Sequence, residues 1–314
     1  MVVTLYIVVP CYNESEVLPE TCKRLTEKLN RLVDTKSVSQ DSKIMFVDDG
    51  SKDNTWQMIE EYHSQYTCVT GLKLSRNRGH QNALLAGLMT AKEQADIVIS
   101  MDADLQDDID AVDAFIEKYK EGNDVVYGVR SSRKTDTFFK RFTATSFYKL
   151  MQFFGAEIVY NHADYRLMSR RALEALEEFR ETNLFLRGIV PLIGFKSESV
   201  YYVPNERFAG QSKYPLKKML GFAAEGIFSF SVKPIRMIRT IGLIIFAVSI
   251  VMLIYSLVSF IVNVTVPGWT SILFSVWALG GLQLLAIGII GEYIGKIYLE
   301  TKQRPKFIID KYLG

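Results

Sequence analysis

The stretch that indicates the fold most directly is Ala95-Asp96-Ile97-Val98-Ile99-Ser100-Met101-Asp102-Ala103-Asp104-Leu105-Gln106-Asp107. Its first five residues form a short, mostly apolar run, which predicts a buried strand. Asp102 and Asp104 follow where this strand ends, and alternate residues of an extended chain point to the same side. Two carboxylates held close together repel each other unless a cation joins them. The spacing therefore favours a Mg²⁺ or Mn²⁺ site shared with substrate phosphates.

A simpler interpretation of the same stretch stays open. The segment could be a solvated acidic loop in which Asp107 or Asp108 caps the next helix. A D-x-D motif alone does not separate the two interpretations, so the rest of the chain has to be weighed with it.

Four other apolar runs predict strands, and the segments between them predict helices. The expected strands are Leu5–Val9, Ile44–Val47, Val69–Leu74 and Asp124–Gly128, and the expected helices are Glu16–Val33, Asp53–Tyr62 with Asp53 as N-cap, a segment ending near Ala91, and Ala111–Lys120. Alternating strands and helices imply an α/β domain with a mostly parallel sheet and helices on both faces.

In such a sheet, ligands bind beyond the carboxyl ends of the strands. Polar residues follow four of the expected strands, as the pairs Tyr12/Glu14, Asp48/Asp49, Arg76/Arg78 and Asp102/Asp104. Together they suit a nucleoside diphosphate: carboxylates near base and ribose, a metal on the phosphates, and arginines for the remaining negative charge. Neither G-x-G-x-x-G nor G-x-x-x-x-G-K-[ST] occurs, which excludes a dinucleotide fingerprint and a P-loop.

The C-terminal third contains a run without charged residues. From Thr240 to Gly291 there is no Lys, Arg, Asp, Glu or His. One membrane span needs about 20 apolar residues, so two spans fit, with a turn at Pro267-Gly268. We expect a transmembrane hairpin over residues 236–295. A buried hairpin in a soluble core is the alternative, but an uncharged run of this length argues against it.

Basic residues flank both ends of this run and are missing from its turn. By the positive-inside tendency, the protein is expected to be a multi-pass protein of the cell membrane with its N-terminal domain in the cytoplasm. Met1 leads directly into a strand-like run, so no signal peptide is expected. The three cysteines, Cys11, Cys22 and Cys68, have no metal-binding spacing and are expected to be free thiols. With 37 Lys+Arg against 35 Asp+Glu, charge does not point to a nucleic-acid partner.

Several short motifs resemble a known family. They are Val9-Pro10-Cys11-Tyr12-Asn13-Glu14, Val47-Asp48-Asp49-Gly50-Ser51, Asn77-Arg78-Gly79 with Ala83, and Asp102-Ala103-Asp104. They look like the inverting family 2 glycosyltransferases of GT-A fold. With the C-terminal hairpin, the whole chain resembles the polyisoprenyl-phosphate glycosyltransferases of the bactoprenol glucosyltransferase type. One departure is Asp107-Asp108-Ile109, where relatives often have prolines; this changes how the next helix begins and leaves the acidic pair in place.

The resemblance implies a set of site residues. The nucleotide-sugar would contact Pro10, Tyr12, Glu14, Asp48, Asp49, Arg78, Asp102 and Gln106, and Asp102 and Asp104 would hold Mg²⁺ or Mn²⁺. Asp164 and Asp104 would be catalytic, with Asp164 as general base. A physical objection stands against that base, because the second pKa of a phosphate monoester is about 6 and a lipid phosphate has already lost its proton. Asp164 could instead orient Arg166 or the acceptor, or form a structural pair with Arg166.

The acceptor half is expected to be basic and aromatic. Arg130, Arg133, Arg166 and Lys213 would bind the acceptor phosphate, and His80 could contact a phosphate. A helix at about 137–154, rich in aromatic and basic residues, would lie in the membrane interface or, alternatively, face the core. The expected layout is a glycosyltransferase domain over 1–205, a flap and juxtamembrane helix over 206–235, the hairpin, and a cytoplasmic tail over 296–314.

Together these expectations describe one reaction. A sugar would pass with inversion from a nucleotide-sugar, UDP-glucose by resemblance, to polyprenyl phosphate for cell-envelope glycosylation. Two alternatives are a processive polysaccharide synthase, which usually needs more membrane helices, and a non-catalytic nucleotide-binding membrane scaffold. Gly280, Gly281, Gly288 and Gly291 offer small-residue faces that would allow a homo-oligomer.

Overall fold

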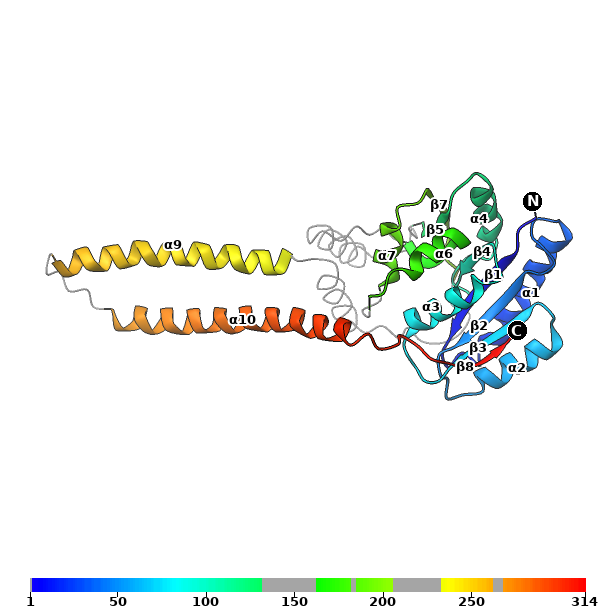
Figure 1. Cartoon of the computed structure of the whole chain (residues 1–314), viewed down its shortest axis with the longest axis horizontal. Helices are drawn as coiled ribbons and strands as arrows, with labels where there is room; N and C mark the ends of the chain where they lie inside the picture. Colours follow the sequence, from blue (N-terminus) through cyan, green and yellow to red (C-terminus); the bar gives the residue numbers. More distant parts are fainter. Residues whose placement is uncertain (1, 132–161, 182–184, 206–232, 262–267) are drawn as a thin grey trace. The chain divides into compact units, whose positions relative to one another are not determined.

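The computed structural model describes residues 2–131, 162–181, 185–205, 233–261 and 268–314 (Figure 1). The chain divides into two compact units. The first contains Met1–Tyr148, Glu157–Leu216 and Arg304–Gly314, and the second contains Lys149–Ala156 and Lys217–Gln303. Each unit is described by itself.

The first unit is built on an eight-stranded mixed sheet with the order β7-β5-β6-β4-β1-β2-β3-β8. The strands are β1 (Leu5–Cys11), β2 (Lys43–Asp48), β3 (Val69–Leu74), β4 (Ile97–Ser100), β5 (Val125–Arg130), β6 (His162–Ser169), β7 (Ser197–Tyr202) and β8 (Ile309–Leu313). The pairs β1–β2, β1–β4, β2–β3 and β5–β7 are parallel. The pairs β4–β6, β5–β6 and β3–β8 are antiparallel. The expected mostly parallel α/β sheet is confirmed.

Helices cover both faces of this sheet. They are α1 (Leu18–Asp34), α2 (Thr55–Gln65), α3 (His80–Ala91), α4 (Ala111–Lys120), α6 (Arg170–Glu177) and α7 (Leu186–Leu192). Ile7 of β1 belongs to the core formed with α1, α2 and α4. The neighbouring Val8 points to the other face and meets α3, where a Cβ on Gly87 would lie 2.4 Å from its Cγ1. Residues alternate between the two faces of a strand, so both faces of β1 are buried, as its continuous apolar run predicts.

Several element boundaries differ from the sequence expectation. β1 continues through Pro10 and Cys11, and Asp48 is the last residue of β2 rather than part of the loop. Asn54, not Asp53, occupies the N-cap of α2, although Asp53 Oδ1 accepts bonds from both the N–H and the hydroxyl of Thr55. The strand β5 ends at Arg130, beyond the expected end at Gly128.

The acidic stretch also differs in detail from the extended strand end that its spacing suggests. Ala103 and Asp104 form a turn, so the chain does not stay extended between the two aspartates. The alternative capping role is wrong as well, because Asp110, not Asp107 or Asp108, stands at the N-cap of α4.

Long-range pairing creates strands that the sequence did not reveal. β8 lies in the segment expected to be a cytoplasmic tail, and it pairs antiparallel with the edge strand β3. Residues Ile309–Leu313 of that segment therefore belong to the sheet of the first unit. β8 is short, mostly exposed and contains no apolar run. Its pairing with β3 keeps it extended. The three cysteines are free thiols, as expected.

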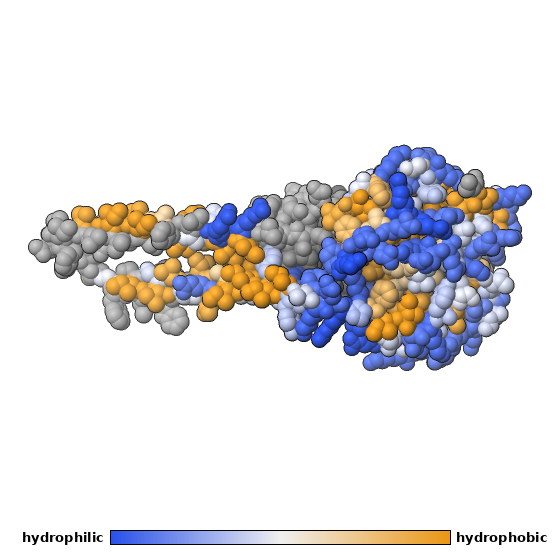
Figure 2. All heavy atoms as spheres, in the orientation of Figure 1, coloured by the Kyte–Doolittle hydropathy of each residue, from blue (hydrophilic) through white to orange (hydrophobic). Residues whose placement is uncertain are grey.

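The second unit contains two long apolar helices that contact each other, α9 (Lys233–Ile261) and α10 (Trp269–Thr301). Large apolar side chains such as Leu284, Ile287 and Ile294 are exposed on α10, and Figure 2 shows apolar surface along these helices. Among the described residues, Leu279–Thr301 is the one segment long and apolar enough to cross a membrane. The expected interfacial helix at about 137–154 and residues 206–232 of the flap lie outside the described residues.

Candidate active site

Two loops at the carboxyl edge of the sheet are joined by hydrogen bonds. After β1, the Asn13 N–H donates to Ser51 Oγ at 3.0 Å, and the Lys52 N–H donates to Asn13 Oδ1 at 2.8 Å. The Glu14 N–H donates to Thr55 Oγ1 at 3.0 Å. The predicted nucleotide-sugar residues Tyr12 and Glu14 thus stand on a loop held by the segment that follows β2.

Asp48 and Asp49 are both buried and bind backbone groups. Asp48 accepts a bond from the Ser51 N–H, and Asp49 accepts bonds from the N–H groups of Arg78 (2.7 Å) and Gly79 (2.9 Å). Burial raises the pKa of each carboxyl, and these backbone donors oppose the rise. Asp49 therefore ties the end of β2 to the loop that leads into α3 and fixes the backbone of Arg78.

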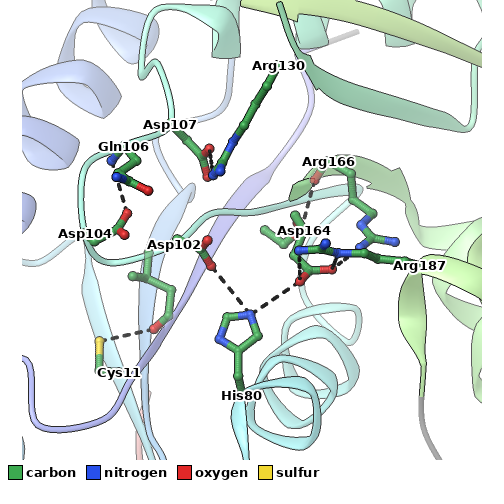
Figure 3. Close-up of polar contacts among 12 residues, drawn as sticks. Cys11, His80, Asp102, Asp104, Gln106, Asp107, Arg130, Asp164, Arg166 and Arg187 are labelled. Atoms are coloured by element: carbon green, nitrogen blue, oxygen red, sulfur yellow. Dashed lines mark hydrogen bonds and ion pairs between the residues drawn. The ribbon is translucent and has the colours of Figure 1, made fainter. Parts of the chain in front are cut away.

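The acidic loop, residues 101–110 between β4 and α4, places Asp102 near the carboxylates of Asp104, Asp107 and Asp164. Burial, together with Asp107, Asp164 and Asp104, raises the pKa of Asp102 to about 6, although His80 opposes this rise. Asp104 is turned back onto its own loop, where its Oδ1 accepts the Gln106 N–H at 3.1 Å (Figure 3). A divalent cation would relieve the repulsion around Asp102, so the two carboxylates fit a metal that prefers oxygen ligands.

The metal would obtain few ligands from the chain itself. Within the described part of the chain, no group of three or more His, Cys, Asp or Glu side chains is arranged to hold a metal ion. Mg²⁺ is usually held by one or two carboxylates, with waters and substrate phosphates completing its shell. Asp102 and Asp104 match that pattern.

Asp164, on β6, is the centre of a charged cluster beside this loop (Figure 3). Its carboxylate accepts bonds from Arg166 at 2.6 Å and from Arg187 at 3.1 Å. His80 Nε2 lies 3.7 Å from Asp164 Oδ2 and 3.5 Å from Asp102 Oδ1, so the imidazole stands between the two carboxylates. The cluster connects the acidic loop with α7.

The electrostatics of this cluster bear on the expected general base. Burial alone raises the pKa of Asp164, but Arg187, His80 and Arg166 together hold it well below its usual range. Burial alone lowers the pKa of His80, and the two carboxylates raise it to about 9. A carboxylate with so low a pKa accepts a proton poorly. The geometry is that of the Asp–Arg pair considered as the alternative role of Asp164.

The two arginines of this cluster differ in access. Arg166 is fully buried, and its Nη1 donates to the Leu186 carbonyl at 3.4 Å, so its guanidinium binds the protein. Arg187, at the start of α7, is 32% exposed. From sequence, Arg166 is predicted to bind the acceptor phosphate, and Arg187 is not among the predicted site residues. No sequence motif links Arg187 to Asp164, because the two residues are 23 positions apart and come together only in the folded protein.

A second ion pair lies on the other side of the acidic loop. Arg130 donates to Asp107 Oδ1 at 3.0 Å, and the Tyr202 hydroxyl donates to the same oxygen. Asp107 is completely buried, whereas Arg130 is 32% exposed. Neither Asp107 nor Tyr202 is among the site residues predicted from sequence, where Asp107 is considered only as a possible helix cap. Arg133 and Lys213, the other predicted acceptor residues, lie outside the described residues.

Comparison with known proteins agrees with this architecture. Residues 6–177 match Glycosyl transferase family 2. The glycosyltransferase YkoT of Bacillus subtilis (strain 168) is 58% identical over 306 residues, which cover 98% of this chain and 91% of that protein. The prophage bactoprenol glucosyl transferase homolog of Escherichia coli (strain K12) is 40% identical over 307 residues, covering 97% and 98%.

A solved structure shows the same fold at low sequence identity. Mannosyl-3-phosphoglycerate synthase from Rubrobacter xylanophilus superposes with a TM-score of 0.50 at 15% identity, and the match covers 76% of this chain and 75% of that one. The likeness is one of fold alone. On the family match and the near full-length relatives, the chain belongs to glycosyl transferase family 2 and is a glycosyltransferase with a GT-A-like domain.

Proposed function

We propose that this protein transfers a sugar from a nucleotide-sugar to polyprenyl phosphate. The observation that carries the proposal is the meeting of the acidic loop with a cluster of cations at one sheet edge. His80 lies between Asp102 and Asp164, and Arg187 binds Asp164. Support for the acceptor comes from the relative named a bactoprenol glucosyl transferase homolog, which matches almost the whole chain. The word glucosyl in this relative's name favours glucose as the sugar, and we propose UDP-glucose as the donor.

In the proposed reaction, an oxygen of the lipid phosphate attacks C1 of the sugar. A new C1–O bond forms to the lipid phosphate while the C1–O bond to the nucleoside diphosphate breaks, and inversion follows from in-line displacement. Asp102 and Asp104 would hold Mg²⁺ or Mn²⁺, with Gln106 beside them. That ion supplies charge neutralisation for the departing diphosphate.

The cations of the chain would act on the acceptor. Arg187 and Arg130 are each partly exposed and held by a carboxylate, so their positions are fixed before the anionic lipid binds. Fixed charges stabilise a reacting anion better than mobile ones because no reorganisation is needed. Asp164 would hold Arg187 in place; the acceptor phosphate has lost its proton near neutral pH and needs no strong base.

A polyprenyl acceptor requires access to a membrane. Leu279–Thr301 is a candidate span, and residues 240–261 of α9 lie in the uncharged stretch Thr240–Gly291. We propose that α9 and α10 cross the cell membrane as a hairpin, with the glycosyltransferase domain in the cytoplasm. The chain would then return after α10 to end in β8 of the sheet.

The function is tested by incubating membranes that contain the protein with polyprenyl phosphate and a panel of labelled nucleotide-sugars. We expect label from one donor, UDP-glucose first, to enter the organic phase, and none to enter with Asp102→Asn. Label in a polymer would favour the processive synthase. Nucleotide binding without any transfer would favour the scaffold and refute the proposal.

A further inference from the structure

One fully buried carboxylate joins the acidic loop to the end of β5. Asp107 Oδ1 accepts bonds from Arg130 Nη2 at 3.0 Å and from the Tyr202 hydroxyl at 2.5 Å. Arg130 Nε also donates to the Tyr202 hydroxyl oxygen at 3.1 Å. Each of the three side chains therefore contacts the other two, and Figure 3 shows the Asp107–Arg130 contact beside Asp102.

The backbone around this triad is held as well. Arg130 and Tyr202 are register partners on the parallel strands β5 and β7. Ser131 donates to the Tyr202 carbonyl from both its N–H and its hydroxyl, each at 2.9 Å. The Asn205 N–H donates to the Gln106 carbonyl at 2.9 Å. The ends of β5 and β7 are thereby tied to the loop that carries the acidic pair.

A buried charge of this kind calls for an explanation. Removing a carboxylate from water is costly unless it is paired and hydrogen-bonded. Apolar side chains of similar volume could replace a buried ion pair without loss of stability, so stability alone does not explain this one. The arrangement instead orders a long cationic side chain that is otherwise free to adopt many rotamers. The bonds to Asp107 and Tyr202 hold the guanidinium of Arg130 in place, and 32% of that side chain is exposed.

We propose that Asp107, with Tyr202, is a positioning residue that orients Arg130 for the phosphate of the lipid acceptor. One loop then sets both sides of the reaction: the donor side through Asp102 and Asp104, and the acceptor side through Asp107. The inference rests on the proposed function and adds to it a residue whose effect passes through Arg130.

The test separates the Michaelis constants for the two substrates. Asp107→Asn keeps the shape of the side chain and removes its charge; Tyr202→Phe removes one hydroxyl. We expect Asp107→Asn to raise the KM for polyprenyl phosphate about tenfold and Tyr202→Phe about threefold, with the KM for the nucleotide-sugar changed less than about twofold. In an Arg130→Ala background, Asp107→Asn should raise the KM for polyprenyl phosphate by less than about a further twofold, because Asp107 is proposed to act through Arg130.

The matched control is Asp124→Asn at the opposite end of β5. Asp124 also pairs with an arginine, Arg171, and accepts the Ser169 hydroxyl at 2.9 Å. Asp124→Asn should leave the KM for the lipid unchanged.

Three outcomes would overturn the proposal: a rise in the KM for the donor instead of the lipid, multiplicative effects of Asp107→Asn and Arg130→Ala, or an equal effect of Asp124→Asn and Asp107→Asn on the KM for the lipid. A wild-type protein that makes no sugar-lipid refutes the proposed function itself, whereas an active wild type with these outcomes refutes only the role of Asp107. Should Asp107→Asn fail to fold, Tyr202→Phe carries the same comparison.

Discussion

Asp102 is the side chain at which the charges of the site converge. Burial raises its pKa most, the carboxylates of Asp107, Asp164 and Asp104 raise it further, and His80 lowers it. Asp107 and Asp164 are paired with arginines, and a bound divalent cation would offset the repulsion that remains between Asp102 and Asp104. The arrangement is consistent with a loop shaped around a bound ion.

Asp102→Asn and Asp104→Asn are expected to abolish turnover. Each change would remove one of the two carboxylates proposed to hold the ion, and loss of the ion would remove several kcal/mol of transition-state stabilisation. The measurement is sugar transfer to polyprenyl phosphate across a range of Mg²⁺ and Mn²⁺ concentrations. Asp110→Asn is the control, because Asp110 follows the same loop but is exposed and pairs with Lys28 and Arg31 of α1. Full activity of either site variant would refute the metal assignment.

Gly50 shows how closely the loops after β2 and β3 approach each other. Its φ is +67°, and a Cβ there would lie 2.6 Å from the backbone nitrogen of Asn77. Glycine is the residue that adopts this conformation without strain and allows so close an approach.

Gly50→Ala is expected to lower stability and to weaken nucleotide binding together. The left-handed conformation alone costs an alanine about 1 kcal/mol, and the clash with backbone should bring the total above about 2 kcal/mol. Thermal unfolding in detergent and nucleotide affinity are the readouts. Gly122→Ala is the control, since Gly122 also has a positive φ but its Cβ would meet only the Lys196 amine at 4.0 Å. Equal effects of the two changes would show that the approach at Asn77 is unimportant.

The strand β8 returns the end of the chain to the sheet of the first unit, where it pairs with β3. Leu313 packs against the core and is the register partner of Gly71, while Ile309 is exposed at the other end of the strand. An unpaired edge of β3 would be open to pairing with other chains.

Leu313→Asp is expected to lower the thermal unfolding temperature and to increase aggregation, because it places a charge against the core and releases the edge of β3. The loss should be about 1–3 kcal/mol. Ile309→Asp makes the same chemical change at an exposed position of β8 and should cost much less. Differential scanning fluorimetry and light scattering report the two effects. Equal stability of the Leu313→Asp variant and the wild type would mean that β8 contributes nothing to the fold.

For the protein as a whole, the proposed membrane hairpin predicts the side of the membrane on which each segment lies. In a Cys68→Ser background, Thr265→Cys should react with a membrane-impermeant maleimide added to intact cells, because it falls between α9 and α10. Asp310→Cys, in β8, should react only after the membrane is permeabilised. The remaining cysteines, Cys11 and Cys22, are buried. Protection of Thr265→Cys in intact cells would contradict the hairpin.

Local patterns predicted much of the first half of the chain. The parallel strands were recognisable because strands buried on both faces are continuous apolar runs, and β3 and α4 have the predicted bounds. The polar groups at the strand ends were recognisable because parallel strands place their carboxyl ends at one edge. The strands β6, β7 and β8 carry no such signal, since they are extended through pairing with distant partners.

The sequence by itself determined the α/β class, the acidic loop at the end of β4, and a long uncharged segment, because each is written in neighbouring residues. Only the tertiary structure decided what surrounds Asp102. β6 inserts antiparallel between β4 and β5, which brings Asp164 beside Ser100, whose hydroxyl donates to the Asp164 carbonyl. Arg187 and His80 then reach Asp164 from α7 and α3. Charges so far apart along the chain interact only after folding, since their attraction depends on distance in space and on burial.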